Sequence, residues 1–299
     1  MKILAIDIGG TTIKSDLYDA LGQSLGHFRE EATAVSIEDQ TNGILDQVLA
    51  LVDDYQASVG GLDGVAISSA GVIDSQAGKV IYSGYTIPAY QGTNFRQVIE
   101  EGRGLPFSIL NDVNAAAYGE FWLGDYAPDA SLICLTIGTG VGGAVLIDGK
   151  IHFGRQFSAG EVGYLPVGSD RFQDVASTTA LCRNYAAMTG QDQVTGREVF
   201  AAYQRGDDKA DQAIRQFTEA LAQGLLPMVY LLNPDAIILG GGVMAQSAIL
   251  LPRIEQALAE RIESDFFLPE KIAAAGLGNE AGRLGAVYHF LQEHPEFSK

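Results

Sequence analysis

The sequence predicts an α/β protein built from two lobes, and three observations lead to this class. Apolar runs of strand length alternate with helical patterns through the first half of the chain. A strand, a glycine-rich turn and a second strand occur in that order twice, once in each half. The chain has 299 residues, enough for two ordinary domains. We therefore expect a duplicated core with one copy in each lobe.

The first lobe is placed at 1–115, completed by a C-terminal helix at about 284–299. Its strands are predicted near 2–8, 12–18 and 23–30. Apolar residues then recur at helical spacing from Ser36, the predicted N-cap, to about Ala57. Two further buried strands end in polar residues, at 68–71 and at 111–112. Ligands of open α/β sheets bind at such strand ends, so we expect the site there.

The second lobe, at 116–283, is richer in helix, and a helix at 113–122 leads the chain towards it. Thr195 and Glu198 have the spacing of a capping box, and a helical pattern runs through 208–232. A strand then leads into three glycines that we expect to pass under an adenine and ribose. These are Gly240, Gly241 and Gly242. The last helices are predicted at 247–263 and 280–292.

The composition narrows the range of partners. A net charge of −18 argues against a nucleic-acid partner or an anionic membrane surface, since both require clustered Lys and Arg. The only cysteines, Cys134 and Cys182, predict neither a disulfide framework nor a cysteine-rich zinc site. We find no signal peptide and no apolar run that could span a membrane. These features predict a cytoplasmic protein with a small-molecule ligand.

The N-terminal turn has the composition of a phosphate-binding hairpin. A buried strand runs directly into two glycines, which permit a tight turn and leave backbone amides open to an anion. Asp7, at the end of the strand, is placed to hold a hydrated Mg²⁺ carried by a nucleotide. The remaining predicted contacts are Gly9, Gly10, Thr11, Thr12 and Lys14. An ordinary hairpin with a surface lysine is the alternative, because glycine-rich turns are common.

The second strand–turn–strand segment, at 131–148, repeats the first. Aligned without gaps, Ile8, Gly9, Leu17 and Asp19 coincide with Ile137, Gly138, Leu146 and Asp148. A duplicated nucleotide-binding core would contain two such hairpins, which could grip phosphates from opposite sides. The predicted contacts of the second hairpin are Thr136, Gly138, Thr139 and Gly140.

Two other glycine-loop types are excluded by context. Gly138, Gly140 and Gly143 have the spacing of a dinucleotide-binding loop, but that loop leads directly into a helix. Here an apolar, partly β-branched run at 144–147 leads into Asp148-Gly149, a hairpin turn. A Walker-type loop is also absent, because neither Gly-Lys pair precedes Ser or Thr.

Asp112 is the predicted general base. Phosphoryl transfer to an alcohol requires clamped phosphates, Mg²⁺ and a carboxylate within reach of the attacking hydroxyl. Asp112 directly follows a buried strand, and its neighbour Asn111 can fix a substrate hydroxyl beside it. The alternative is that the pair only caps the next helix. A loop at 157–164 offers Glu161 for paired sugar hydroxyls and Tyr164 for stacking, although a loop glutamate is commonly just solvated.

The motifs resemble those of the ROK family of repressors, open reading frames and sugar kinases, within the superfamily of sugar kinases, heat-shock ATPases and actin. The matching segments are 7–14, 135–144, 238–243 and the catalytic-type segment 111–117. The resemblance implies two actin-like ATPase (ribonuclease H-like) lobes with an interlobe cleft, ATP and Mg²⁺ as cofactors, and Asp112 as the base for a sugar 6-hydroxyl. It also implies sugar contacts from Gly71, Asn94, Asn111 and Glu161.

The chain departs from the family pattern in two ways. The family usually has His where Tyr164 stands, and that His joins a cysteine-rich loop in binding zinc. The loop at 167–174 has no cysteine, so we predict no zinc. The family's second sugar-binding Glu aligns near Gln173 or Asp174, which predicts different recognition around the anomeric carbon. Within a small zinc-less branch, the chain is most similar to the β-glucoside kinases.

The resemblance therefore implies an ATP-dependent kinase acting on the 6-hydroxyl of a glucose-type sugar, a β-glucoside or a disaccharide. Alternatives within the family are glucokinase, N-acetylmannosamine kinase and fructokinase. A sugar-sensing transcriptional regulator is an alternative of another class, although the acidic chain begins at the first strand without a helix-turn-helix. A sugar-binding protein without catalysis is a third. Aromatic residues at 266–267 and in the C-terminal tail also suggest a homodimer.

Overall fold

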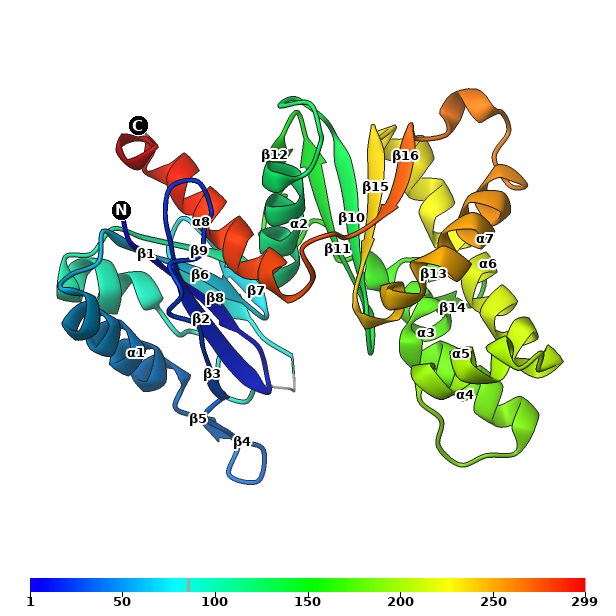
Figure 1. Cartoon of the computed structure of the whole chain (residues 1–299), viewed down its shortest axis with the longest axis horizontal. Helices are drawn as coiled ribbons and strands as arrows, with labels where there is room; N and C mark the ends of the chain where they lie inside the picture. The colour runs from blue at the N-terminus through cyan, green and yellow to red at the C-terminus, as the bar shows by residue number, and fades with distance from the viewer. Residues whose placement is uncertain (85–86, 299) are drawn as a thin grey trace. The chain divides into compact units, whose positions relative to one another are not determined.

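Two five-stranded sheets organise the chain, one in each of two units (Figure 1). The computed structural model describes residues 1–84 and 87–298. Unit 1 comprises Met1–Tyr126, Phe153–Ser158 and Asn279–Lys299, of which residues 85, 86 and 299 lie outside the described residues. Unit 2 comprises Ala127–His152 and Ala159–Gly278.

The sheet of unit 1 has the strand order β3-β2-β1-β6-β9. The elements of this unit are β1 (Ile3–Ile8), β2 (Thr12–Tyr18), β3 (Arg29–Ala32), β4 (Val35–Ser36), β5 (Thr41–Asn42), α1 (Ile44–Val59), β6 (Gly64–Ser69), β7 (Val72–Asp74), β8 (Lys79–Tyr82), η1 (Gln97–Glu101), β9 (Phe107–Asn111), α2 (Asp112–Leu123), α8 (Ala281–Glu293) and η6 (Pro295–Phe297).

The sheet of unit 2 has the order β12-β11-β10-β15-β16. Its elements are β10 (Leu132–Ile137), β11 (Val141–Ile147), β12 (Lys150–Ile151), η2 (Val162–Tyr164), β13 (Pro166–Val167), β14 (Asp170–Arg171), α3 (Phe172–Ala176), α4 (Thr178–Thr189), α5 (Gly196–Gln204), α6 (Asp208–Leu232), β15 (Ala236–Gly240), η3 (Gly242–Gln246), α7 (Ser247–Ala259), η4 (Asp265–Phe267) and β16 (Lys271–Ala274). A last turn, η5 (Gly278–Glu280), leads back to unit 1.

The two sheets have the same topology, which confirms the duplication predicted from the repeated hairpin. In unit 1, β1 pairs antiparallel with β2 and parallel with β6, and β6 pairs parallel with β9. In unit 2, β10 pairs in the same two ways with β11 and β15, and β15 pairs parallel with β16. The central strands of both sheets are apolar and buried, as expected for strands covered on both faces.

The predicted helix at 36–57 begins later than expected. Ser36 is not its N-cap, because the Ser36 hydroxyl instead donates to the Asp39 carboxylate over 2.8 Å, in a turn that joins β4 to β5. The side chain of Ile37 is consequently exposed, and α1 starts at Ile44. The strand expected at 23–30 also starts late. The Asp16 carboxylate accepts hydrogen bonds from Ser24 and the His27 amide, which holds this segment in a loop before β3.

Helices α2 and α8 pack backbone to backbone within unit 1 (Figure 1). A Cβ added to Gly285 would lie 1.6 Å from the Ala115 carbonyl oxygen, and one added to Gly119 would lie 2.4 Å from that of Ala281. Only glycine permits this distance, so these two positions fix α8 against α2. Farther along α8, the Phe290 ring fills the space where a side chain at Gly64 would stand.

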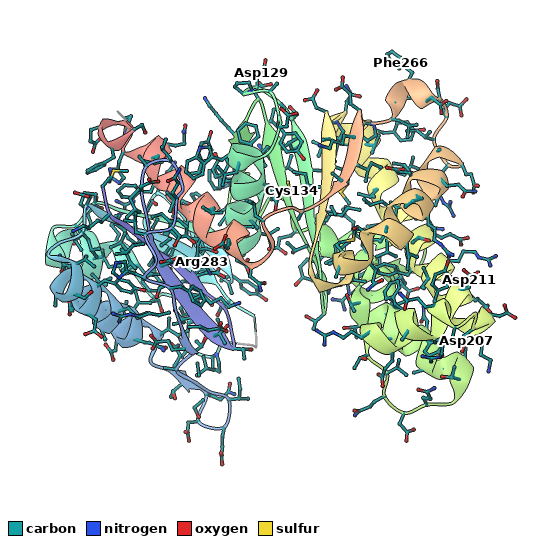
Figure 2. All side chains as sticks on the ribbon, in the orientation of Figure 1. Asp129, Cys134, Asp207, Asp211, Phe266 and Arg283 are labelled. Atoms are coloured by element: carbon teal, nitrogen blue, oxygen red, sulfur yellow. The ribbon has the colours of Figure 1, made fainter. Side chains whose placement is uncertain are left out.

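Aromatic residues of the predicted dimer contact have different environments. Phe290 is fully buried, and Tyr288 stacks on Trp122 with ring centroids 5.4 Å apart, so Phe290 cannot serve as a surface contact. In η4, by contrast, Phe266 is 85 % exposed on an outer turn of unit 2 (Figure 2). The homodimer stays a prediction. Among the described residues, no helix is both long and apolar enough to cross a bilayer.

Candidate active site

The residues predicted for the site lie in both units, and each unit is described by itself. Unit 1 contains Asp7, Gly9, Gly10, Thr11, Thr12, Lys14, Gly71, Asn94, Asn111 and Asp112. Unit 2 contains Thr136, Gly138, Thr139, Gly140, Glu161, Tyr164, Gln173, Asp174, Gly240, Gly241 and Gly242.

In unit 1, the polar residues gather where the parallel strands β1, β6 and β9 end. Asp7 is in register with Ser68, and Ser69 is in register with Asn111. The Ser68 hydroxyl donates to Asp7 Oδ1 over 2.7 Å. The sheet thus brings Asp7 and Asn111 to the same edge, as the strand-end argument predicted.

Asn111 both caps α2 and orients Asp112. Its Oδ1 accepts hydrogen bonds from the backbone amides of Val113 at 3.0 Å and Asn114 at 3.1 Å. Its Nδ2 donates to Asp112 Oδ1 over 2.8 Å. The capping role and the positioning role, which the sequence presented as alternatives, are therefore combined in one side chain. Asp112 is the first residue of α2 and is half-buried.

The two carboxyl groups of this edge influence each other. Burial, followed by the nearby negative charge of Asp7, raises the pKa of Asp112 to about 6. Burial also raises the pKa of Asp7, against the opposing effects of the Ser68 hydrogen bond, Arg283 and Lys14. A carboxyl group with a pKa near 6 is ionised at neutral pH and is more basic than an ordinary aspartate. Asp112 thus has the proton affinity of a general base.

The N-terminal turn forms without special backbone angles. The Gly9 amide donates to the Thr12 carbonyl over 3.0 Å, but neither Gly9 nor Gly10 has a φ in the left-handed region. The turn therefore does not use the positive φ that glycine permits, although a Cβ at Gly9 would lie 3.2 Å from the Thr12 carbonyl oxygen. Thr33 in turn binds the Thr11 and Gly9 carbonyls.

Lys14 stands opposite Asp7 in the β1–β2 ladder. The expected pairing of an acid and a cation at the turn is therefore present. Of the two sugar contacts in the loops, Gly71 is joined to the site, because Asn111 Nδ2 donates to its carbonyl over 2.9 Å. The Asn94 Oδ1 instead accepts from the Gln97 amide at 3.1 Å. Among the described residues, no hydrogen bond joins Asn94 to Asp112.

Sequence reasoning missed two groups of unit 1. Tyr90 is buried, shares a hydrogen bond of 2.7 Å with the Ser69 hydroxyl, and lies near enough to Asp112 for the two to interact electrostatically. Arg283 is buried inside unit 1 (Figure 2), and its charge acts on Asp7. Its position among small and apolar residues at the start of α8 is the signal that could have identified it, since buried arginines are rare.

In unit 2, a groove of about 890 Å³ lies between the second glycine turn, α4 and the loop before α5. The groove is lined by Gly138, Thr139, Thr178, Thr179, Cys182, Arg183, Ala186, Asp192, Gln193, Val194, Thr195, Glu198, Gly242 and Val243. Its volume is in the range of sites for nucleotide-sized ligands. Three of the predicted nucleotide contacts, Gly138, Thr139 and Gly242, are among these residues.

The N-terminus of α4 closes one end of the groove. The Thr178 amide donates to the Gly138 carbonyl over 2.9 Å, and the Thr179 hydroxyl donates to the Thr139 carbonyl over 3.0 Å. A Cβ at Gly138 would meet no atom within 4 Å, so the turn borders open space. The positive end of the α4 dipole favours an anion at this place. The groove therefore fits a phosphate-bearing ligand.

The three glycines at the end of β15 and directly after it have different roles. Gly242 lines the groove, whereas Gly241 packs on β10, where a Cβ would lie 2.2 Å from the Ile137 carbonyl oxygen. Gly241 also has a φ of 97°, which other residues rarely adopt. Gly240 pairs with Thr136 across the β10–β15 ladder. Gly240 and Gly241 thus hold the turn that follows β15 close to the end of β10, where the second glycine turn begins.

The loop around Glu161 adjoins the second glycine turn through Gln173. A Cβ at Gly140 or at Gly163 would lie 3.1 Å from Gln173 Oε1. Glu161 and Tyr164 are exposed beside this position. Asp174 is not brought to the turn, because its carboxylate forms an exposed ion pair with Arg171 at 3.4 Å. Gln173 is therefore the better placed of the two residues that were considered for sugar contact.

A model of the ROK family matches residues 3–293. The chain belongs to the ROK family. A β-glucoside kinase of Listeria monocytogenes serovar 1/2a is 34 % identical over 303 residues, covering 98 % of this chain and 98 % of that protein. A ROK family protein from Streptococcus pneumoniae TIGR4, solved in complex with sucrose, has a TM-score of 0.84 and 28 % identity, covering 99 % of this chain and 100 % of that one.

A ROK family glucokinase from Streptomyces griseus, solved with glucose and AMPPNP, has a TM-score of 0.79 and 28 % identity, covering 98 % of this chain and 100 % of that one. These likenesses confirm the ROK resemblance and the two-lobed, actin-like α/β fold predicted with it. Within residues 1–84 and 87–298, we find no group of three or more His, Cys, Asp or Glu side chains arranged to hold a metal ion.

Proposed function

We propose that this ROK family chain is an ATP-dependent sugar kinase that phosphorylates the 6-hydroxyl of a glucose-type sugar, including the glucose unit of a β-glucoside or disaccharide. The observation that carries the proposal is Asp112. It stands at the carboxyl edge of a parallel sheet, is oriented by Asn111, and has a pKa raised to about 6. Relatives named β-glucoside kinase and glucokinase support this reading over a regulator.

The chemistry requires one proton acceptor on the protein. Asp112 accepts the proton of the sugar 6-hydroxyl as the hydroxyl oxygen bonds to the γ-phosphorus of ATP. The bond from that phosphorus to the bridging oxygen of ADP breaks, and ADP leaves with the electron pair. The Asn111 amide holds Asp112 in place throughout, because it also bonds the Gly71 carbonyl.

The nucleotide contacts are divided between the units. In unit 2, the groove beside Gly138, Thr139 and Gly242 would bind adenosine and phosphates. In unit 1, Asp7 would hold Mg²⁺ through water, since its Oδ1 is bound by Ser68 and its Oδ2 has no hydrogen-bond partner among the described residues. When bound, Mg²⁺ neutralises charge on the phosphates. Lys14, opposite Asp7, adds a second positive charge.

The sugar contacts are proposed from Asn94, Asn111, Gly71, Glu161 and Tyr164. We place Gln173, rather than Asp174, at the end of the sugar that carries the anomeric carbon, because it adjoins Gly163 in the loop after Glu161. Neutral Gln173 and an exposed Tyr164 leave fewer charged ligands there, which favours a substrate that carries a further group on the anomeric carbon.

The test is a panel of sugars with saturating MgATP, in which ADP formation is measured for glucose, N-acetylmannosamine, fructose, cellobiose and sucrose. Phosphorus NMR of the product locates the new phosphate, and 6-deoxyglucose serves as the matched control. We expect turnover with at least one glucose-containing sugar and none with 6-deoxyglucose. A product phosphorylated at another hydroxyl, or a rate of ADP formation that is the same with and without sugar, would contradict the proposal.

A further inference from the structure

The first turn of α8 lies directly against the Asp7 carboxylate. A Cβ added to Gly282 would lie 3.1 Å from Asp7 Oδ1, 3.4 Å from Asp7 Cγ and 3.0 Å from Ser68 Oγ. These are the three nearest atoms, and all belong to the pair that forms the hydrogen bond at the end of β1. Such distances are tighter than ordinary carbon contacts, so any side chain at Gly282 must displace a neighbour.

Helix α8 cannot be the part that moves. Gly285, three residues on, faces the Ala115 carbonyl oxygen so closely that an added Cβ would lie only 1.6 Å away, and Gly119 faces Ala281 in the same way. The helix also packs on β1, β6 and β9. Close-packed backbone resists displacement far more than a carboxylate at the end of a strand does. A methyl group at position 282 would therefore push the Ser68 hydroxyl and the Asp7 carboxylate to which that hydroxyl donates.

We propose that Gly282 is a positioning residue for Asp7: its missing side chain lets Oδ1 rest on Ser68 and keeps Oδ2 available for the hydrated Mg²⁺ of the nucleotide. The proposal rests on the proposed function, in which Asp7 serves the nucleotide. The C-terminal helix α8 thus contributes to the active site, although it lies far from the glycine turns in the sequence.

The next residue, Arg283, supports this assignment by its charge. Its side chain is 3 % exposed, its Nε donates to the Tyr18 hydroxyl over 3.1 Å, and its guanidinium lies over the Phe28 ring at 5.1 Å. Its Nη1 is buried without a hydrogen-bond partner. Two carboxylates balance this buried cation: Glu280, whose Oε1 lies 3.8 Å from Arg283 Nη2, and Asp7, whose pKa the Arg283 charge lowers against the effect of burial. In the first turn of α8, Gly282 thus leaves space for the Asp7 carboxylate, and Arg283 contributes positive charge near it.

The experiment replaces Gly282 with Ala in the full chain. A misplacement of about 1 Å at a reacting centre costs about 10²-fold in rate, so we expect a shift of a few tenths of an ångström to lower kcat by about tenfold. We expect that loss, together with an about fivefold higher Mg²⁺ concentration at half-maximal rate and an unchanged KM for the sugar. A second readout needs no turnover: calorimetry of ADP binding with and without Mg²⁺, in which the gain in affinity from Mg²⁺ shrinks in Gly282→Ala.

Two variants separate positioning from stability. Gly102→Ala adds the same methyl group at an exposed helical position with ordinary contacts only, and should match the wild type. Leu284→Ala removes packing from another face of α8 and should lower the melting temperature without changing the Mg²⁺ dependence. A loss of kcat in Leu284→Ala equal to that in Gly282→Ala, with the same Mg²⁺ response, would overturn the proposal.

A rescue completes the test. In Ser68→Gly/Gly282→Ala the Ser68 hydroxyl no longer competes for the space, so the Gly282→Ala change should cost less than it does in the wild-type background. The double variant also remains informative where the single variant does not fold. Full activity and full Mg²⁺ response in Gly282→Ala would overturn the inference and leave the kinase proposal standing. Wild-type protein that binds MgADP but phosphorylates no sugar would reject the kinase and leave Gly282 to be judged by calorimetry. Failure to bind MgADP would reject both.

Discussion

Asn111 Nδ2 donates a hydrogen bond of 2.8 Å to Asp112 Oδ1, while the Oδ1 of the same asparagine caps α2. One side chain therefore links the start of a helix to the orientation of the proposed base. The helix cannot shift at its first turn without moving the carboxylate. Replacing Asp112 therefore tests the proposed base directly.

Replacing Asp112 with Asn should reduce phosphoryl transfer to a small residual rate while sugar and ATP still bind. General bases contribute about 10²–10⁴-fold to rate, so kcat should fall by about that factor. Steady-state kinetics and calorimetric sugar binding measure the two effects. Asp129→Asn makes the same chemical change at an exposed position and should retain full activity. An Asp112→Asn variant with more than about a tenth of the wild-type kcat would remove Asp112 from the role of base.

The activity should depend on pH through Asp112. Only the ionised carboxylate can accept a proton, and burial and Asp7 raise the pKa of Asp112 to about 6. The rate should therefore be constant above about pH 7 and fall tenfold per pH unit well below pH 6. A profile of kcat/KM from pH 4.5 to 8 measures this, with the residual rate of Asp112→Asn as the control. A wild-type rate that stays constant down to pH 4.5 would contradict the assignment.

The same shift predicts that Asp112→Asn stabilises the fold at neutral pH. The folded protein holds the Asp112 proton more tightly than the unfolded chain does, so ionisation opposes folding. That cost is complete above about pH 6 and vanishes below about 3.8, the ordinary value. The free energy of unfolding should rise by about 1–2 kcal/mol at pH 7.5 and be unchanged at pH 3.5. Urea denaturation at both pH values measures it, and a loss of stability at pH 7.5 would show that the carboxylate is not destabilising.

Cys182 should report nucleotide binding. It lines the groove of unit 2, whereas Cys134 is buried in β10. Burial and the nearby Glu198 raise the pKa of the Cys182 thiol, so alkylation should be slow at pH 7 and faster at pH 9. Mass spectrometry should find one adduct at early times, and ATP should slow its formation. Sugar alone should not protect. Labelling of Cys182 at the same rate with and without ATP would place the nucleotide elsewhere.

Gly285 should be essential for stability. An added Cβ would lie 1.6 Å from the Ala115 carbonyl oxygen, so Gly285→Ala must separate α8 from α2. Overpacking of this kind costs about 3 kcal/mol, and backbone contact places it at the upper end of the range. Chemical denaturation compares it with Gly102→Ala, whose added methyl would meet nothing closer than 3.5 Å. Equal stability of the two variants would show that the helices can part freely.

The sequence predicted those features of the fold and the site that depend on local patterns. The repeated hairpins predicted two sheets of the same topology, because each glycine turn is flanked by strands with clear alternation or burial. The placement of Asp7 and Asn111 at one sheet edge followed from the parallel order of the strands. The α6 helix and the capping box of Thr195 and Glu198 were also predicted correctly, since their signals are local.

Other features depended on contacts that sequence spacing does not reveal. Ser36 was predicted as an N-cap, but its hydroxyl donates to the Asp39 carboxylate in a turn, and α1 starts only at Ile44. Gly282 and Arg283 are far from Asp7 in the chain, and only the packing of α8 brings them to it. The groove of unit 2 is formed largely by α4 and the loop before α5, which carry no glycine motif.

The packing of α8 on α2 also bears on how the protein is made. Unit 1 begins with β1 and is finished by α8, and all of unit 2 is synthesised between α2 and α8. Gly64 of β6 is covered by Phe290, and Gly119 of α2 by the backbone at Gly285. Both surfaces of unit 1 therefore stay uncovered until α8 has been synthesised. By that time unit 2 can already fold around its own core. Unit 1 is therefore the later of the two to complete, and during that delay its uncovered apolar surface is the part of the nascent protein that a chaperone would protect.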